Sequence, residues 1–267
     1  MKIADATIEI RPRSASELVD TAVLFYRTHF PLLFSQTAVF GFPAVVVAMS
    51  IHYLTHSAFF AIAVLMVLLS LLTGAVVASA GRIVFGSRLT LRESLGVYRS
   101  VWGRYFGRKL WENIVCLLFL PVVIGYAWHL AFSYTAPVGI LEQLRGRDLR
   151  IRRKGLLRRG GGNSFVFDFQ LILVVTAFAA GAICLLELTL GNVFTLWQDT
   201  GLRSEEVLDD PMRLGIWMAA VVVVCPIYSL GWFFRYLDAR IRAEGWDLEL
   251  DFRRAAQRLE EGNGSER

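Results

Sequence analysis

The amino-acid sequence predicts an all-α fold, a polytopic transmembrane helical bundle with interfacial amphipathic helices. Hydrophobic residues make up 55% of the 267 residues and charged residues only 19%, whereas soluble domains contain about 25% charged residues. The apolar residues lie in long stretches without charge, separated by short polar segments that are rich in arginine. Lipid is therefore the expected solvent for much of the chain, which we expect to form about six membrane segments.

Four uncharged windows have the length of a membrane-spanning helix. A helix that crosses the hydrocarbon core needs about 20 mainly apolar residues, because each residue adds about 1.5 Å. Charged or titratable residues bound each window, as expected where a helix leaves the lipid. The four predicted spans are residues 30–51, 57–81, 169–186 and 214–234.

The middle window, residues 113–141, contains 29 uncharged residues, too many for one upright helix and too few for two complete ones. The flanking segments 82–112 and 142–163 hold seven and eight basic residues, and each holds two acidic residues. Because basic segments are retained in the cytoplasm, the window should enter the membrane and return. We expect a hairpin or two short helices here, with a break around Gly125 to Pro137.

A single tilted helix, kinked at proline, is the alternative for this window. It would give five spans and would place one basic segment on the outer side of the membrane, against the usual bias. With an even number of crossings, the N-terminus and the C-terminus both lie in the cytoplasm. The expected location is the inner membrane of a bacterium.

Two segments begin with a capping box, in which a hydroxyl and a glutamate three residues later satisfy each other's backbone amides. Residues 14–29 open with Ser14-Ala-Ser-Glu17 and place apolar side chains on one face. A second segment opens with Thr90-Leu-Arg-Glu93 and interleaves aromatic with basic residues up to Lys109. Both are expected to be amphipathic helices that lie along the lipid headgroups.

The domain organisation is expected to be simple. Residues 1–261 form a single transmembrane helical domain, and its last part, residues 247–261, is expected to be a cytoplasmic amphipathic helix. Residues 262–267 are polar and are expected to be a disordered tail.

Three stretches carry a resemblance to known proteins. They are Arg11-Pro-Arg-Ser-Ala-Ser-Glu17-Leu-Val-Asp20, the segment containing Tyr98-Arg99, and Arg235-Tyr-Leu-Asp238 through Glu244-Gly-Trp246-Asp247-Leu-Glu249-Leu. With them the chain resembles a group of uncharacterised bacterial polytopic inner-membrane proteins, which includes proteins likened to the membrane domain of some glycerophosphodiester phosphodiesterases. The resemblance implies a helical bundle in the cytoplasmic membrane. It implies no reaction, because the phosphodiesterase of those proteins is a separate soluble domain that this sequence does not contain.

Polar residues near the membrane windows form a candidate polar cavity made of His129, Asp168 and Gln170. Ionisable groups within a membrane are costly and often mark a functional site. The simpler interpretation is that Asp168, at the end of its span, reaches headgroups or water, and that His129 hydrogen-bonds a carbonyl of the broken helix. Contact between Asp168 and His129 would favour the polar site.

The basic segments are expected to bind anionic lipid headgroups, at about 1 kcal/mol for each basic residue near the surface. A nucleic-acid partner is not expected, because the basic residues lie directly beside apolar stretches. The candidate lipid-facing basic residues are Arg99, Arg108, Lys109, Arg152, Arg153 and Lys154.

No catalytic, cofactor-binding or metal-binding motif occurs, so neither a catalytic residue nor a cofactor is predicted. The favoured function is a non-enzymatic scaffold or accessory subunit that binds anionic lipid and a membrane or cytoplasmic partner protein. The alternative is a transporter or lipid-handling permease component with a cavity at the broken middle helix. A membrane-embedded enzyme is the least favoured hypothesis.

Overall fold

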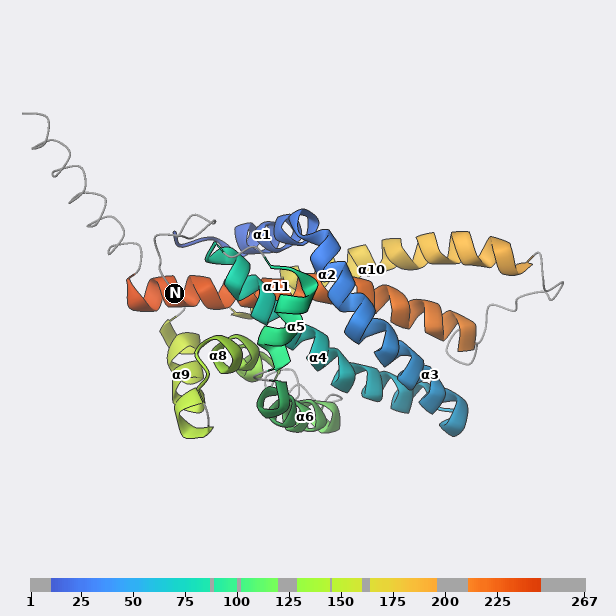
Figure 1. Ribbon diagram of the computed structural model, residues 1–267, viewed down its shortest axis with the longest axis horizontal. Coiled ribbons are helices and arrows are strands. Elements are labelled where there is room, and N and C mark those ends of the chain that lie inside the picture. Colours follow the sequence, from blue (N-terminus) through green and yellow to red (C-terminus); the bar gives the residue numbers. More distant parts are fainter. Residues whose placement is uncertain are drawn as a thin grey trace, which may run out of the picture.

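The computed structural model describes residues 11–86, 89–99, 102–119, 129–144, 146–159, 164–195 and 211–245. These ranges consist of helices joined by short turns and contain no strand, which confirms the all-α fold class. Figure 1 shows the helices gathered around the long helix α11. In chain order they are α1 (Ala15–Thr28), α2 (Phe30–Gln36), η2 (Thr37–Gly41), α3 (Phe42–Thr55), α4 (Ala58–Val84), α5 (Leu91–Arg99), α6 (Trp102–Phe119), α8 (Thr135–Leu141), α9 (Gly146–Arg159), α10 (Ser164–Thr195) and α11 (Pro211–Glu244).

Within the described residues, four helices are long and apolar enough to cross a membrane. Each coincides with one of the four predicted windows and continues past its charged boundary at one end or both. The first consists of α2, η2 and α3 in direct succession, and the others are α4, the larger part of α10, and α11. They cover Phe30–Thr55, Ala58–Val84, Ser164–Thr189 and Pro211–Glu244.

The first of these helices contains a wide π-helical turn, η2, between α2 and α3. Pro43 follows at the start of α3 and has no amide hydrogen for a regular helical bond, which accounts for a widened turn at this place. Gly41 ends the turn and faces α11, where an added side-chain carbon would lie 2.3 Å from Val222 Cγ1. The glycine therefore allows the first span to approach α11 closely.

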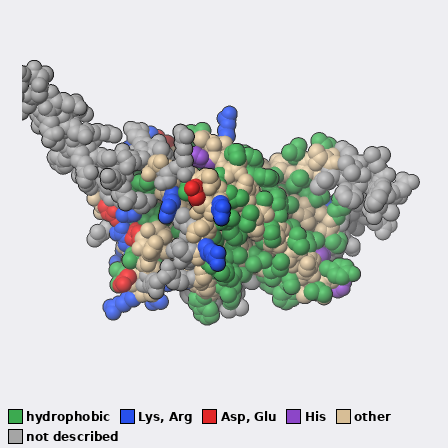
Figure 2. All heavy atoms as spheres, in the orientation of Figure 1, with side chains coloured by type: hydrophobic (Ala, Val, Ile, Leu, Met, Phe, Trp, Pro, Cys, Tyr) green, Lys and Arg blue, Asp and Glu red, His purple; other side chains and the backbone are tan. Residues whose placement is uncertain are grey.

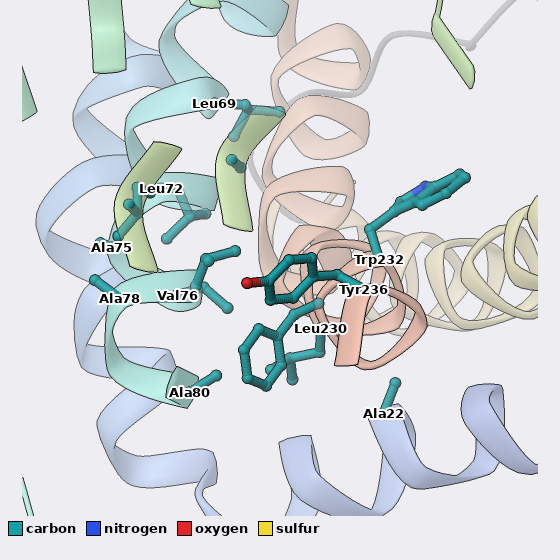
Figure 3. Packing of buried hydrophobic residues seen from close by; sticks show 14 of the residues in the cluster. Ala22, Leu69, Leu72, Ala75, Val76, Ala78, Ala80, Leu230, Trp232 and Tyr236 are labelled. Carbon is teal, nitrogen blue, oxygen red and sulfur yellow. The ribbon is translucent and has the colours of Figure 1, made fainter. Parts of the chain in front are cut away.

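The centre of the bundle is the contact between α4 and α11, and Figure 3 shows the side chains that meet there. On the α4 side of this contact, the small residues Val76 and Ala80 point toward α11, and both are fully buried. Leu230 and Tyr236 of α11 fill the space opposite and are fully buried. Small side chains on one helix and large ones on the other give close packing without a hydrophobic driving force from water.

The helix α1 packs on α11 as well, and its start has the predicted capping box. The Glu17 amide donates to Ser14 Oγ at 3.3 Å, and the Ser14 amide donates to Glu17 Oε2 at 2.9 Å. The apolar face of α1 is buried, and the Phe25 ring lies 5.4 Å from the Phe234 ring in an edge contact. Just before α1, the Arg13 amide donates to the buried Asp238 carboxylate at 2.9 Å.

The second predicted amphipathic segment is divided between two helices, α5 and α6, and residues 100 and 101 between them lie outside the described residues. Its capping box is present, since the Thr90 amide donates to Glu93 Oε2 at 2.8 Å and the Glu93 amide donates to Thr90 Oγ1 at 3.4 Å. Tyr98 of α5 and Tyr105 of α6 both lie against Gly74 of α4. The two tyrosines of this segment thus pack into the bundle, whereas Trp102 is exposed.

The helix α6 runs along α4 in the opposite direction. Tyr105 lies against Gly74, and further along α6 the Asn113 side chain donates to the Met66 carbonyl at 3.3 Å. The chain then returns, because Thr135 Oγ1 at the start of α8 donates to Glu112 Oε1 at 3.0 Å. Contact between residues at the two ends of the middle window is incompatible with one kinked helix that crosses the bundle.

The return path is α8, whose last residue, Leu141, lies against Gly81 near the end of α4. This arrangement agrees with a segment that enters and returns, but it does not reproduce the expected count of about six membrane segments. The helix α8 has seven residues, which is about 10 Å of helix and too short to cross a bilayer. Residues 120–128, which hold most of the predicted break, lie outside the described residues.

Charged side chains gather at one end of the bundle, as Figure 2 shows, and hydrophobic side chains cover most of the rest of the visible face. The charged end contains α8, α9 and the last turns of α11, and the opposite end contains the turn between α3 and α4 (Figure 1). The predicted C-terminal helix, residues 247–261, and the tail, residues 262–267, lie outside the described residues.

Candidate functional site

Three hydrogen-bonded polar side chains link the middle segment to two of the membrane-length helices. The Tyr228 hydroxyl of α11 donates to Asp168 Oδ1 of α10 at 2.8 Å, and its oxygen lies 2.5 Å from His129 Nε2. Because the single hydroxyl proton is used toward Asp168, the oxygen accepts the proton that His129 carries on Nε2. The His129 and Tyr228 rings are also stacked, with 6.0 Å between their centroids.

Helix geometry explains why Asp168 meets Tyr228. Asp168 lies one turn into α10 and is fully buried. Close to Tyr228 on α11, Gly231 lets Leu171 of α10 approach, because a side-chain carbon added at Gly231 would lie 2.6 Å from the Leu171 side chain. Of the predicted polar cavity, the structure brings His129 and Asp168 together through Tyr228. Gln170 does not join them, and its Oε1 is buried with no hydrogen-bond partner among the described residues.

A second polar cluster surrounds Glu112 of α6, whose side chain is 2% exposed. Three basic side chains lie within ion-pair distance of this one carboxylate: Arg108 Nε at 3.2 Å, Lys109 Nζ at 3.6 Å and Arg153 Nη1 at 3.5 Å. Thr135 joins α8 to the cluster, because its hydroxyl donates to Glu112 and accepts from Arg153 Nη1 at 3.0 Å. The cluster therefore connects α6, α8 and α9.

Arg153 is the most deeply buried of these cations, with 7% of its side chain exposed. Its guanidinium carbon lies 4.5 Å from the centre of the Phe132 ring, a cation–π contact. Burial lowers the pKa of Arg153, the positive charges of Arg108 and Arg150 act in the same direction, and Glu112 opposes them. Burial is thus the main reason that the charged form of Arg153 is disfavoured, and the carboxylate of Glu112 does not fully offset it.

At the neighbouring Arg152, contacts with carboxylates outweigh the effect of burial. Its Nε donates to Glu142 Oε2 at 2.8 Å, and its Nη2 bonds the Glu244 carboxylate at the end of α11. Burial acts to lower the pKa of Arg152, but the hydrogen bonds to these two carboxylates outweigh it and raise the pKa. Glu142 also accepts a hydrogen bond from the Tyr236 hydroxyl at 2.7 Å.

The predicted lipid-facing basic residues are therefore not equivalent. Arg99 and Lys154 are exposed, and Arg108 and Lys109 are partly exposed beside Glu112. Arg152 and Arg153 differ from the expectation, because the first is paired with two carboxylates and the second is buried inside the protein. Acidic residues distant in the sequence explain the difference, since buried arginines are normally paired.

The helix α9 has a clear division between an inner and an outer face. Leu149, Arg153 and Leu156 are buried against the bundle. On the opposite side, at spacings of three and four residues that place them on one helix face, the exposed residues are Arg147, Arg150, Ile151, Lys154 and Arg158. This outer face of α9 carries four positive charges around one apolar side chain.

Sequence reasoning missed Tyr228 and Glu112, the two residues at the centres of the polar groups. Tyr228 lies in an apolar window where tyrosine is unremarkable. Glu112 ends a basic segment and offered a signal, because an isolated acid beside Arg108 and Lys109 at helical spacing predicts ion pairs. No group of three or more histidine, cysteine or acidic residues in the described part of the chain is arranged to hold a metal ion.

The fold is all-α within the described residues, and its four helices that are long and apolar enough to cross a membrane indicate a membrane protein. No protein-family description, curated protein or solved structure matches the chain.

Proposed function

We propose that this protein is a non-enzymatic membrane scaffold or accessory subunit that binds anionic lipid headgroups and a partner protein at the inner membrane of a bacterium. The observation that carries the proposal is the outer face of α9, where Arg147, Arg150, Lys154 and Arg158 are exposed together around Ile151. A basic helix face with an apolar residue in it suits an anionic leaflet. The inner face of the same helix is committed to contacts within the protein.

The lipid part of the proposal is tested with the purified full chain in detergent, by titration with phosphatidylglycerol and with phosphatidylcholine. A double variant, Arg147→Gln with Lys154→Gln, removes two of the outer charges. At about 1 kcal/mol for each charge, phosphatidylglycerol affinity should fall by roughly 30-fold. The matched control is Arg213→Gln, which removes a partly exposed basic residue at the other end of the bundle. Equal affinity in the double variant and the wild type would refute the lipid-binding role.

The orientation on which the proposal depends is tested separately. We expect the segments containing Arg99 and Arg147 to lie on the same, cytoplasmic, side of the membrane, as the basic residues around the middle window require. Single cysteines placed at these two positions should react with an impermeant reagent from the same side in inverted membrane vesicles. Reaction from opposite sides would overturn the topology and, with it, the cytoplasmic placement of α9.

The alternative, a transporter or lipid-handling permease component, is favoured by one observation, the chain formed by His129, Tyr228 and Asp168. A buried carboxylate joined to a histidine between membrane helices is a common feature of substrate and proton pathways. If the protein moves a lipid or solute across liposomes, and Tyr228→Phe abolishes that movement while folded protein remains, the scaffold proposal fails. If neither the wild type nor the Tyr228→Phe variant moves a lipid or solute, the scaffold proposal is supported.

A further inference from the structure

The cluster around Glu112 has more positive than negative charge. Arg108, Lys109 and Arg153 all contact this single carboxylate, and Glu112 is the acidic side chain within ion-pair distance of any of them in the described part of the chain. The excess is therefore two positive charges within one small group. A fourth cation, Arg150, is close enough to act on Arg153 electrostatically.

The cluster also has unused hydrogen-bonding capacity. Arg153 Nε is buried and has no hydrogen-bond partner in the described part of the chain, whereas the buried Glu112 Oε2 lies 3.6 Å from Lys109 Nζ. Arg108 uses its Nε toward Glu112, which leaves the terminal nitrogens of its guanidinium available to an acceptor. Buried donors normally have a partner, so the Arg153 Nε–H group without one among the described residues favours a bound acceptor at the cluster.

The ligand should be an anion with several oxygen acceptors. A partly buried excess of positive charge is stabilised by a bound anion, and arginine forks match the geometry of phosphate oxygens. A phosphomonoester carries a charge of roughly −1.5 to −2 at neutral pH, which balances the excess of two. A phosphodiester carries only one negative charge and leaves the cluster half neutralised.

Access to the cluster is from the side of α6. The side chains of Arg108 and Lys109 are 28% and 17% exposed, whereas Glu112 and Arg153 lie behind them. Trp102 and Trp111 are exposed on the same helix, and tryptophan is enriched where a membrane protein meets the headgroup region. A ligand that combines a phosphate with an apolar tail fits these neighbours.

We propose that Arg108, Lys109 and Arg153 form a binding site for a phosphomonoester group, as carried by phosphatidate or by a soluble phosphomonoester. The site is distinct from the outer face of α9, and it deepens the lipid-binding part of the proposed function by naming the headgroup chemistry. Glu112 holds the three cations together in the absence of the anion, and the anion then completes the neutralisation.

The experiment measures apparent affinity from ligand-induced shifts in melting temperature of the full chain in detergent. The probes are phosphatidate, phosphatidylglycerol, glycerol 3-phosphate and inorganic phosphate. Arg108→Gln and Lys109→Gln should each weaken phosphatidate binding about fivefold. The matched control is Arg152→Gln, which removes the same charge from a site with two carboxylates and should leave the affinity unchanged.

Glu112→Gln tests whether the excess positive charge of the cluster is what binds the anion. It raises the positive excess and should strengthen phosphatidate binding, whereas loss of a purely structural ion pair would weaken it. The proposal is overturned if phosphatidate and phosphatidylglycerol bind equally, or if Lys109→Gln binds phosphatidate like the wild type. Preferential binding of glycerol 3-phosphate or inorganic phosphate would assign the same site to a soluble ligand in place of a lipid.

The two lipid proposals fail in different ways. The double variant at Arg147 and Lys154 should lose phosphatidylglycerol affinity while the preference for phosphatidate persists. If that double variant keeps its phosphatidylglycerol affinity, the outer-face proposal fails and the phosphomonoester site stands. If Lys109→Gln keeps its phosphatidate affinity, the phosphomonoester site fails and the outer-face proposal stands.

Discussion

The Tyr228 hydroxyl connects His129 with Asp168, and Tyr228→Phe removes this hydrogen-bonded connection while the aromatic ring stays in place. The variant deletes two hydrogen bonds, at 2.5 Å to His129 Nε2 and at 2.8 Å to Asp168 Oδ1. A hydrogen bond to a charged group contributes about 1.5–3 kcal/mol, and a neutral one about 1 kcal/mol. Because Asp168 is fully buried, away from bulk solvent that could supply another donor, we expect destabilisation of about 2–4 kcal/mol.

Tyr236→Phe is the matched control, since it makes the same change on the same helix. The Tyr236 hydroxyl also donates to a carboxylate, Glu142, at 2.7 Å. Glu142 keeps Arg152 as a strong partner after the change, so the control should cost only about 1 kcal/mol. The assay is reversible unfolding in mixed micelles with increasing denaturing detergent. If Tyr228→Phe is no more destabilising than Tyr236→Phe, the hydroxyl does not hold the three side chains together.

Four further predictions follow from local geometry. Ser14→Ala removes the cap of α1 and should lower the unfolding free energy by about 1 kcal/mol in the same assay. Gly41→Ala should destabilise by about 1–3 kcal/mol, because the new carbon would lie 2.3 Å from Val222; a neutral result would show that the helices are not in close contact there. Gly155→Ala on α9, with nothing within 4 Å, should instead stabilise by up to about 1 kcal/mol. Burial raises the pKa of Tyr26 to about 12, above the usual value of about 10. The stability that depends on its protonated hydroxyl is therefore complete below pH 10 and lost between about pH 10 and 12. Tyr26→Phe should remove this loss of stability at alkaline pH, which is measured as the unfolding free energy at a series of pH values.

The features that could be predicted from the sequence depend on neighbouring residues. The four apolar helices follow from windows of suitable length between charges, and the capping box at Ser14 follows from a hydroxyl and a glutamate three residues apart. The charge count predicted that the middle segment enters the membrane and returns. Contact between Thr135 and Glu112 shows that the chain turns back between these residues, while the placement of both basic flanks on one side of the membrane stays a prediction.

The features that could not be predicted depend on partners far apart in the chain. Arg152 and Arg153 look alike in sequence, but Arg152 meets Glu142 and Glu244, whereas Arg153 meets Glu112, 41 residues earlier. Hydropathy and spacing contain no information on such pairs. His129 and Asp168 were grouped as candidates, but the residue that joins them was hidden in an apolar window, where a tyrosine has no distinguishing signal.

The helix α9 shows why the charge count of a segment does not determine what its charges do. The positive-inside bias responds to the number of basic residues in the segment, and it is the same whichever face they occupy. The fold then divides them: Arg152 and Arg153 face acidic side chains of α6, α8 and α11, while Arg147 and Lys154 remain exposed. Neutralised charges contribute to packing and little to a distant anion, because their field is cancelled locally. Only exposed or uncompensated charges attract a ligand strongly, and within the described residues the outer face of α9 and the cluster around Glu112 both hold such charges, which is why our two binding proposals are placed there.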